Sequence, residues 1–261
     1  MLWTTDQDRA LYSIAEASAG LTHAEIATRF TRATGIPTSE DGVRNRLKRI
    51  RADIELNNLA RTSPAHEEPF DLLPAPEGEF VGFRMGFFDI ETTGLTAIMG
   101  RLLSCSIADN FGNLVTGTIL DHPGKTIIDD SALAEWYRDQ LEQYDILVGW
   151  NSKMYDVPML NARLMRWGKR PMRGDMMHAD IMWKARASSS GLRIGSSKLD
   201  NVAKFFRTKN QKSEIDWDTW TLAGTGDPDA IAEVTRHGRA DVLVTRDVFN
   251  HLKPLIRTIH R

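Results

Sequence analysis

The sequence predicts a small helical domain followed by a larger α/β domain, in which helices flank a mixed sheet. Three observations lead to this: helical periodicity over the first fifty or so residues, a proline-rich stretch after them, and strand patterns that then alternate with helical ones. At 261 residues the chain exceeds one minimal domain. We predict a helical domain over 1–56, a linker over 57–79 and the α/β domain over 80–261.

Three short helices are expected in the first domain. The first begins soon after the N-terminus and ends at Gly20. Thr22 followed by Glu25 has the pattern of a capping box that opens the second helix, which stops near 35–37. Ser39 can cap the third.

The third helix is basic. Between 43 and 51 there is no acid, and the basic residues are Arg44, Arg46, Lys48, Arg49 and Arg51. Such a face can bind phosphates although the whole chain has a formal net charge of -2.

The larger domain begins with a predicted three-strand meander. Strands are expected over 82–90, 102–108, 114–120 and 146–148. Helices are expected over 131–143, 157–167, 198–205 and 229–252. A meander followed by alternating helices and a strand indicates a mixed sheet covered by helices.

Composition excludes several classes of protein. Hydrophobic residues make up 41% and charged residues 26% of the chain, ordinary figures for a globular protein. No run approaches the roughly 18 apolar residues of a membrane span, and the first residues lack the pattern of a secretion signal. A single cysteine, Cys105, excludes an internal disulfide and a thiolate zinc cluster. We therefore expect a cytoplasmic protein with no membrane partner.

Four acids are candidates for a metal site. Asp89 and Glu91 lie two apart at the end of a predicted strand, on one face, and can hold one hard cation. Asp156 begins a helix after a strand, and Asp241 lies one turn after His237 on the last helix. If the fold brings the four acids together, they can hold two divalent cations, which is the arrangement of two-metal phosphoryl transfer.

Each of these residues also has a structural explanation. The first two acids could simply be solvated at a strand end, and Asp156 could cap its helix just before Pro158. His237 and Asp241 could be an exposed helical pair. Their order and spacing, taken together, favour the metal site.

Three segments resemble the motifs of the DnaQ-like, or DEDD, 3′–5′ exonucleases. They are FFDIETTGL (87–95), GWNSKMYD (149–156) and HGRADVLVTRDVF (237–249), and the resemblance spans roughly 83–252. In that family the third motif is Tyr-x3-Asp or His-x4-Asp. This chain has His237-x3-Asp241, the tyrosine spacing with a histidine. The flanking residues resemble the tyrosine branch, which includes the proofreading domains of family B polymerases.

This resemblance implies an RNase H-like fold and a metal-dependent mechanism. Asp89 would bridge two Mg²⁺ or Mn²⁺ ions, Glu91 and Asp241 would complete the tighter site, and Asp156 would hold the second ion through water. His237 would orient or deprotonate the attacking water, which displaces the 3′-terminal nucleotide as a 5′-monophosphate.

The resemblance also implies a pocket for that terminal nucleotide. Thr92, Thr93 and Leu95 would line it, and Asn151 would support it.

The first domain resembles a Myb/SANT-like helix-turn-helix. The similarity rests on Trp3-Thr4, Asp8, Leu11, AEIATRF and VRNRLKRIR. In such a module the third helix enters the major groove, and its candidate contacts are Arg44, Asn45, Arg46, Lys48 and Arg49. The alternative is a helical bundle that docks on the nuclease or on another protein.

The leading hypothesis is a two-metal 3′–5′ exonuclease that degrades DNA and is encoded by a prokaryote or a phage. It could proofread beside a separate DNA polymerase or replication protein, act in repair, or degrade host DNA. One alternative is a 3′–5′ exoribonuclease. Another is a DNA-binding regulator whose nuclease fold is not catalytic. DNA is favoured over RNA because both resemblances lean that way.

Overall fold

The computed structural model describes residues 5–17, 20–62, 82–186 and 191–256. The chain divides into two compact units, Met1–Ala65 and His66–Arg261. We call them the N-terminal unit and the C-terminal unit and describe each by itself.

The N-terminal unit holds the three expected helices, α1 (Thr5–Glu16), α2 (His23–Thr34) and α3 (Glu40–Thr62). The predicted capping box at the start of α2 is present: Thr22 Oγ1 accepts from the N–H of Glu25 at 3.3 Å, and Glu25 Oε2 accepts from the N–H of Thr22 at 2.8 Å. Gly35 ends α2 with a φ of 71°, which favours glycine. The buried core of this unit consists of Leu11, Ala15, Ile26, Ala27, Phe30, Val43 and Leu47.

Helix α3 runs further than the sequence led us to expect. It continues to Thr62, so residues 57–62, which we expected to begin an extended linker, are helical. The segment 57–62 contains neither glycine nor proline, and the next proline is Pro64, so nothing in it interrupts the helical hydrogen bonds. The remainder of the predicted linker, 63–79, and residue 80 lie outside the described residues.

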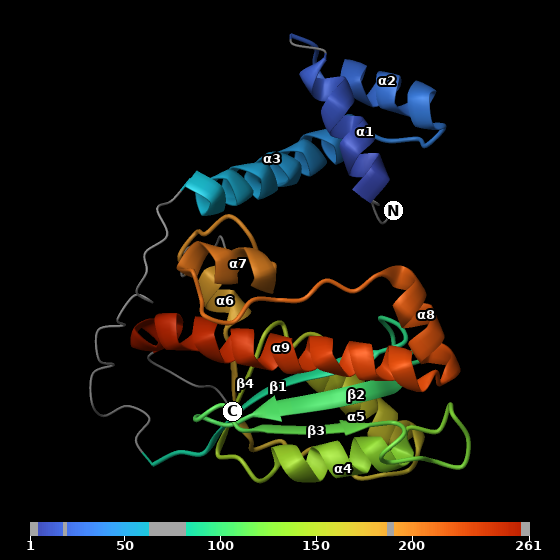
Figure 1. Cartoon of the computed structure of the whole chain (residues 1–261), viewed down its shortest axis with the longest axis vertical. Coiled ribbons are helices and arrows are strands. Elements are labelled where there is room, and N and C mark those ends of the chain that lie inside the picture. Colours follow the sequence, from blue (N-terminus) through green and yellow to red (C-terminus); the bar gives the residue numbers. More distant parts are fainter. Residues whose placement is uncertain (1–4, 18–19, 63–81, 187–190, 257–261) are drawn as a thin grey trace. The chain divides into compact units, whose positions relative to one another are not determined.

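The C-terminal unit is built on the expected mixed sheet, with strand order β3-β2-β1-β4-β5 (Figure 1). β1 (Met85–Thr92), β2 (Leu102–Ala108) and β3 (Leu114–Thr118) form an antiparallel meander. β4 (Ile146–Gly149) is parallel to β1, and β5 (Met177–Asp180), which was not predicted as a strand, is parallel to β4. The carboxyl ends of β1, β4 and β5 therefore lie at the same edge.

Helices cover both faces of this sheet (Figure 1). They are α4 (Ser131–Leu141), α5 (Asp156–Arg166), α6 (Met182–Ala185), α7 (Leu199–Phe206), α8 (Trp217–Thr225) and α9 (Pro228–Leu252), with a short 3₁₀ turn, η1, at Lys253–Leu255. The long α9 packs along β1 and β2 on one face, whereas α4 and α5 lie on the other.

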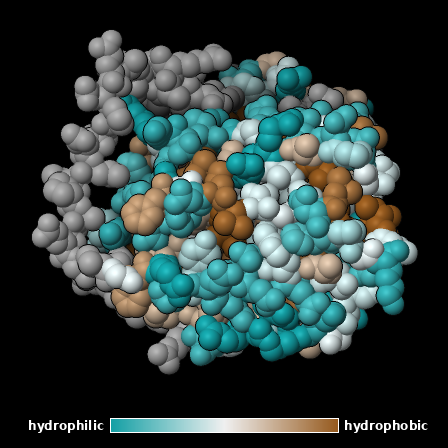
Figure 2. Space-filling model, turned by 60° about the horizontal axis from the view of Figure 1, so that its bottom comes forward, coloured by the Kyte–Doolittle hydropathy of each residue, from teal (hydrophilic) through white to brown (hydrophobic). Residues whose placement is uncertain are grey.

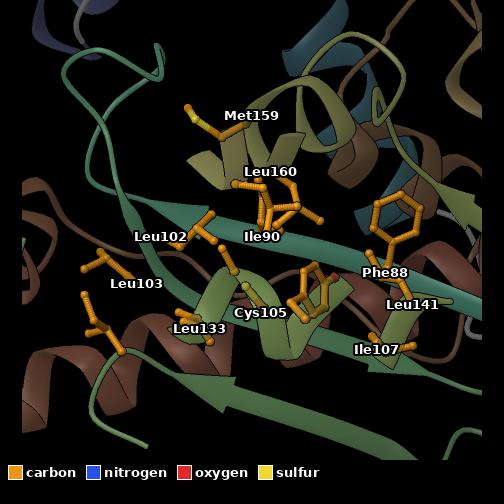
Figure 3. Packing of buried hydrophobic residues seen from close by; sticks show 14 of the residues in the cluster. Phe88, Ile90, Leu102, Leu103, Cys105, Ile107, Leu133, Leu141, Met159 and Leu160 are labelled. Atoms are coloured by element: carbon orange, nitrogen blue, oxygen red, sulfur yellow. The ribbon is translucent and has the colours of Figure 1, made fainter. Parts of the chain in front are cut away.

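Alternation along β1 separates two cores. Phe88 and Ile90 pack with residues of α4 and α5 such as Leu133 and Leu160 (Figure 3). Phe87 points to the other face, where its ring meets that of Phe249 of α9 edge to face at 5.4 Å. Side chains in step with Phe87 along β1 consequently face α9.

None of the helices that the structure describes is both long enough and apolar enough to cross a lipid bilayer. The face shown in Figure 2 is mostly hydrophilic, with separate hydrophobic groups among the polar ones. Single exposed apolar side chains of this kind are ordinary on folded proteins.

Candidate active site

The two acids of β1 lie on the face covered by α9. Asp89 and Glu91 follow Phe87 at steps of two, and both are half-buried. Glu91 lies against α9 at Gly238, where a Cβ atom would be 3.1 Å from Glu91 Cγ and 3.2 Å from its Oε1. Glycine inside a helix costs about 1 kcal/mol relative to alanine. At this position it lets the carboxylate approach the helix between His237 and Asp241.

Asp156 reaches the same region from the start of α5, the helix that follows the neighbouring strand β4. It is the first residue of α5, and its Oδ1 accepts from the N–H of Ile90 in β1 at 3.2 Å. The turn before it is held by Asp180 of β5, whose carboxylate accepts from the N–H groups of Asn151 and Lys153, both at 3.0 Å. β5 thus fixes the segment that carries Asp156.

Asp241 and His237 are both buried on α9, and they lie one turn apart as predicted. The ammonium group of Lys212 forms an ion pair with Asp241 Oδ2. The other oxygen, Oδ1, is buried and has no hydrogen-bond partner. A buried carboxylate oxygen without a partner is costly, so it is a natural place for a cation or a water molecule.

The charges of these acids act on one another. Burial raises the pKa of Asp89 well above its usual range, and the neighbouring charges of Glu91, Asp156 and Asp241 raise it further. Burial, followed by the charge of Asp241, raises the pKa of Glu91 to about 8. Burial raises the pKa of Asp156 to about 7. The four acids that the sequence singles out are therefore close enough to repel each other, and added positive charge would relieve the repulsion.

Lys212 supplies part of that positive charge. Burial alone would lower the pKa of Lys212, but the charge and hydrogen bond of Asp241 outweigh this effect and raise it. The lysine remains charged at neutral pH and neutralises one of the carboxylates.

His237 is held from two sides. Its Nδ1 lies 2.8 Å from Ser213 Oγ, and its Nε2 lies 3.9 Å from Asp241 Oδ2. The rings of Trp220 and His237 are nearly perpendicular, with their centroids 6.2 Å apart. Burial lowers the pKa of His237 although Asp241 opposes the shift. The imidazole is thus neutral at neutral pH.

The residues expected to form a nucleotide pocket occupy two adjoining turns. Thr92 Oγ1 hydrogen-bonds to the Tyr155 hydroxyl at 2.6 Å, and Thr93 Oγ1 accepts from the N–H of Arg101 at 3.1 Å. Leu95 is 75% exposed. Asn151 has a φ of 61° in the turn before Asp156. The threonine hydroxyls therefore help to hold the two turns, while Leu95 is free to contact a ligand.

Three residues that the sequence did not single out contribute to the site. Lys212 pairs with Asp241, Ser213 contacts His237, and Asp180 of the unpredicted strand β5 holds the turn before Asp156. Nε2 of His178 lies 2.8 Å from Ser152 Oγ, and burial lowers the pKa of this histidine to about 4. Lys212 and Ser213 lie in an irregular segment, where no periodic pattern indicates which element they contact.

The donor set fits hard divalent cations. Carboxylate oxygens are what Mg²⁺ and Mn²⁺ prefer, and Asp241 Oδ1 lacks a partner. Among the described residues, however, no three His, Cys, Asp or Glu side chains already lie close enough to ligate one ion. The ammonium group of Lys212 pairs with the other oxygen of the Asp241 carboxylate, Oδ2.

Several basic residues of α3 form ion pairs with acids of the N-terminal unit. Arg44 pairs with Glu40 at 2.6 Å and Asp41 at 2.8 Å, and Arg46 pairs with Asp8 of α1. Arg51 also lies 3.8 Å from Glu16. Three of the five basic residues between 43 and 51 therefore have an acidic partner within the unit.

Arg46 is half-buried, and its ion pair with Asp8 joins α3 to α1. This structural role accounts for the arginine without any contact to DNA. Arg44, Asn45, Lys48 and Arg49 are exposed.

Comparison with known proteins identifies the superfamily. The family model described as RNase_H superfamily matches residues 86–253, well over half of the chain. The chain belongs to the RNase H superfamily. A search of the curated proteins finds no significant match.

A solved structure shares the fold. The family B DNA polymerase from the hyperthermophilic archaeon Pyrobaculum calidifontis is similar, with a TM-score of 0.53 and 19% sequence identity. The match covers 66% of this chain and 25% of the polymerase chain, so this chain corresponds to only a part of that protein.

Proposed function

We propose that the protein is a metal-dependent 3′–5′ exonuclease that removes nucleoside 5′-monophosphates from DNA. The observation that carries the proposal is the gathering of four carboxylates, with raised pKa values on three of them, beside a neutral buried histidine. Burying so many acids together is unfavourable unless cations bind there. Membership of the RNase H superfamily supports nucleic acid as the substrate.

Asp89, Glu91, Asp156 and Asp241 would hold two divalent ions. When bound, such a pair supplies a water of lowered pKa and neutralises the charge that develops on the phosphate. The raised pKa values mean that the acids bind metal best after they lose their protons, so we expect activity to rise with pH through about 7 to 8.

His237 would accept the proton of the attacking water. If Nδ1–H donates to Ser213 Oγ, the lone pair of Nε2 faces the carboxylates and is free to accept. A neutral imidazole is a better base at pH 7 than the tyrosine phenol usual at this position in the resembling branch.

Lys212 would exchange partners when substrate binds. With Asp241 holding an ion, the ammonium group of Lys212 would leave Oδ2 and pair with a phosphate oxygen of the substrate. Thr92, Thr93, Leu95 and Asn151 are proposed to hold the terminal nucleotide, and the exposed Leu95 would pack on its base.

The test uses a 5′-labelled DNA oligonucleotide with Mg²⁺ or Mn²⁺. The protein should yield a ladder of shortened products and mononucleotides, and a chelator should stop the reaction. Asp89→Asn should lower kcat by about a hundred- to a thousandfold, the loss typical when a group that stabilises the transition state is removed. Asp175→Asn, at an exposed aspartate outside the cluster, is the matched control. Normal cutting by Asp89→Asn would contradict the assignment.

The same assay on a matched RNA strand separates the alternatives. Faster cutting of RNA would indicate an exoribonuclease. A retarded but intact band would indicate a DNA-binding regulator without catalysis.

The N-terminal unit is proposed to bind DNA through Arg44, Asn45, Lys48 and Arg49, as the Myb/SANT-like resemblance implies. A DNA-binding tether raises the concentration of substrate near the catalytic unit without new catalytic contacts. A separate DNA polymerase or replication protein remains a proposed partner.

A further inference from the structure

The C-terminal unit also contains a strongly basic segment. Between β5 and α8 the described residues 182–186 and 191–212, which we call the basic stretch, contain one acid, Asp200. Eight basic residues against this one acid give a local charge of +7, whereas the whole chain is -2. The basic residues are Lys184, Arg186, Arg193, Lys198, Lys204, Arg207, Lys209 and Lys212.

The end of the basic stretch runs along α9 toward α8 (Figure 1), and its last residue, Lys212, pairs with Asp241. Its contacts follow α9 backwards, from the carboxyl end toward the middle. In chain order they join Phe206 to His251, Asn210 to Asp247, Lys212 to Asp241 and, one residue beyond the stretch, Ser213 to His237. The segment 206–212, which contains Arg207, Lys209 and Lys212, therefore runs along α9 toward the candidate active site.

The middle of the stretch is tied to the turn after β4. Trp150, in that turn, donates from Nε1 to the carbonyl oxygen of Ser197 at 3.0 Å. This turn also carries Asn151 and leads to Asp156. The basic stretch therefore contacts both α9, which carries Asp241, and the turn that leads to Asp156.

Exposed aromatic rings lie within the stretch. Trp183 is 46% exposed and Phe205 is 52% exposed. The guanidinium of Arg186 lies over the Trp183 ring, 5.2 Å from its centroid. Proteins that bind single-stranded nucleic acid combine positive charge for the backbone with aromatic side chains on which bases stack.

We propose that the basic stretch is the track that holds a single nucleic-acid strand leading into the active site. This inference rests on the proposed function. A cluster of four carboxylates repels a polyanion, so the strand must be held by charges outside the cluster. The basic stretch supplies them next to the cluster, and its exposed rings favour unpaired bases over a closed duplex.

The experiment compares two triple variants of the full chain. The first changes Arg186→Gln, Lys198→Gln and Lys209→Gln. The control changes Lys125→Gln, Arg166→Gln and Arg173→Gln, which removes the same charge from exposed residues outside the stretch. The substrates are a single strand of about ten nucleotides, within the usual site size of such grooves, and thymidine 5′-monophosphate p-nitrophenyl ester, which has no upstream strand.

In the first triple variant we expect the ratio of kcat/KM for the oligonucleotide to that for the ester to fall about tenfold, mainly through the KM of the oligonucleotide. The slope of log KM against log salt should fall by about 2, since each phosphate contact on a single strand contributes roughly 0.7. The control triple should retain the wild-type ratio. An equal loss in both triples, no loss in either, or a larger loss on blunt duplex than on single strand overturns the proposal.

A failure of the proposed function would be distinguishable. If the wild-type protein hydrolyses neither substrate, the exonuclease proposal fails. The track is then tested by the fluorescence anisotropy of the labelled single strand in chelator. Weaker binding by the first triple than by the control supports the track, and equal binding overturns it.

Discussion

His237 depends on Ser213 for its orientation. The 2.8 Å contact between Ser213 Oγ and Nδ1 is the hydrogen bond that can set the tautomer of the ring and leave Nε2 toward the carboxylates. Trp220 limits movement of the same ring from the side. In the proposed reaction, these two contacts hold the ring of a histidine that stands where the resembling branch has tyrosine.

This contact gives a prediction on activity. Ser213→Ala should lower kcat about fivefold with little change in KM, since one hydrogen bond of about 1 kcal/mol orients the ring. Ser213→Thr, which keeps the hydroxyl, should restore most of the rate. In a His237→Tyr background Ser213→Ala should have no further effect, measured by single-turnover hydrolysis. An equal loss in both backgrounds would show that Ser213 acts only through folding.

At the scale of elements, the local signals in the sequence were sufficient for most of the fold. The capping box of α2, the strand alternation of β1 and the apolar periodicity of α9 act within a few residues, so they are visible without the structure. β5 is only four residues long and has no alternating pattern. The ion pair of Lys212 with Asp241 joins residues 29 positions apart, and no local rule predicts it.

The packing of β1 on α9 gives the next prediction. Gly238→Ala should stabilise α9 by up to about 1 kcal/mol through helix propensity. It should nevertheless lower kcat several-fold, because the new Cβ displaces Glu91 by a few tenths of an ångström. Gly42→Ala in α3 meets neighbours at similar distances of 3.1 and 3.2 Å, far from the carboxylates in sequence, and is the control for stability. Unchanged kcat in Gly238→Ala would show that the approach of Glu91 is not needed.

The free energy of unfolding of the whole molecule should depend on the ionisation of the carboxylate cluster, which consists of Asp89, Glu91, Asp156 and Asp241. Glu91 and Asp156 have pKa values of about 8 and 7 in the fold, against ordinary values near 4. At pH values between the ordinary and the raised pKa, these carboxyl groups are protonated in the folded protein and ionised in the unfolded chain. The free energy of unfolding therefore falls as the pH rises toward 8. Divalent cations bind the deprotonated acids and should oppose this fall.

We therefore expect the Tm in chelator to decrease from pH 6 to pH 8, and Mg²⁺ to raise the Tm more at pH 8 than at pH 6. Scanning calorimetry of the full chain measures both. Glu91→Gln should flatten the pH dependence, because the amide does not titrate. A Tm that Mg²⁺ shifts equally at both pH values would mean that the ions bind elsewhere.

The central claim is that four acids from distant parts of the chain bind a pair of divalent ions. The anomalous scattering of crystals soaked in Mn²⁺ tests it most directly. The account predicts two peaks among Asp89, Glu91, Asp156 and Asp241, roughly 3.5–4 Å apart as in two-metal sites, with the ammonium group of Lys212 moved away from Asp241. Crystals without manganese at these carboxylates, in which Lys212 still pairs with Asp241, would contradict it.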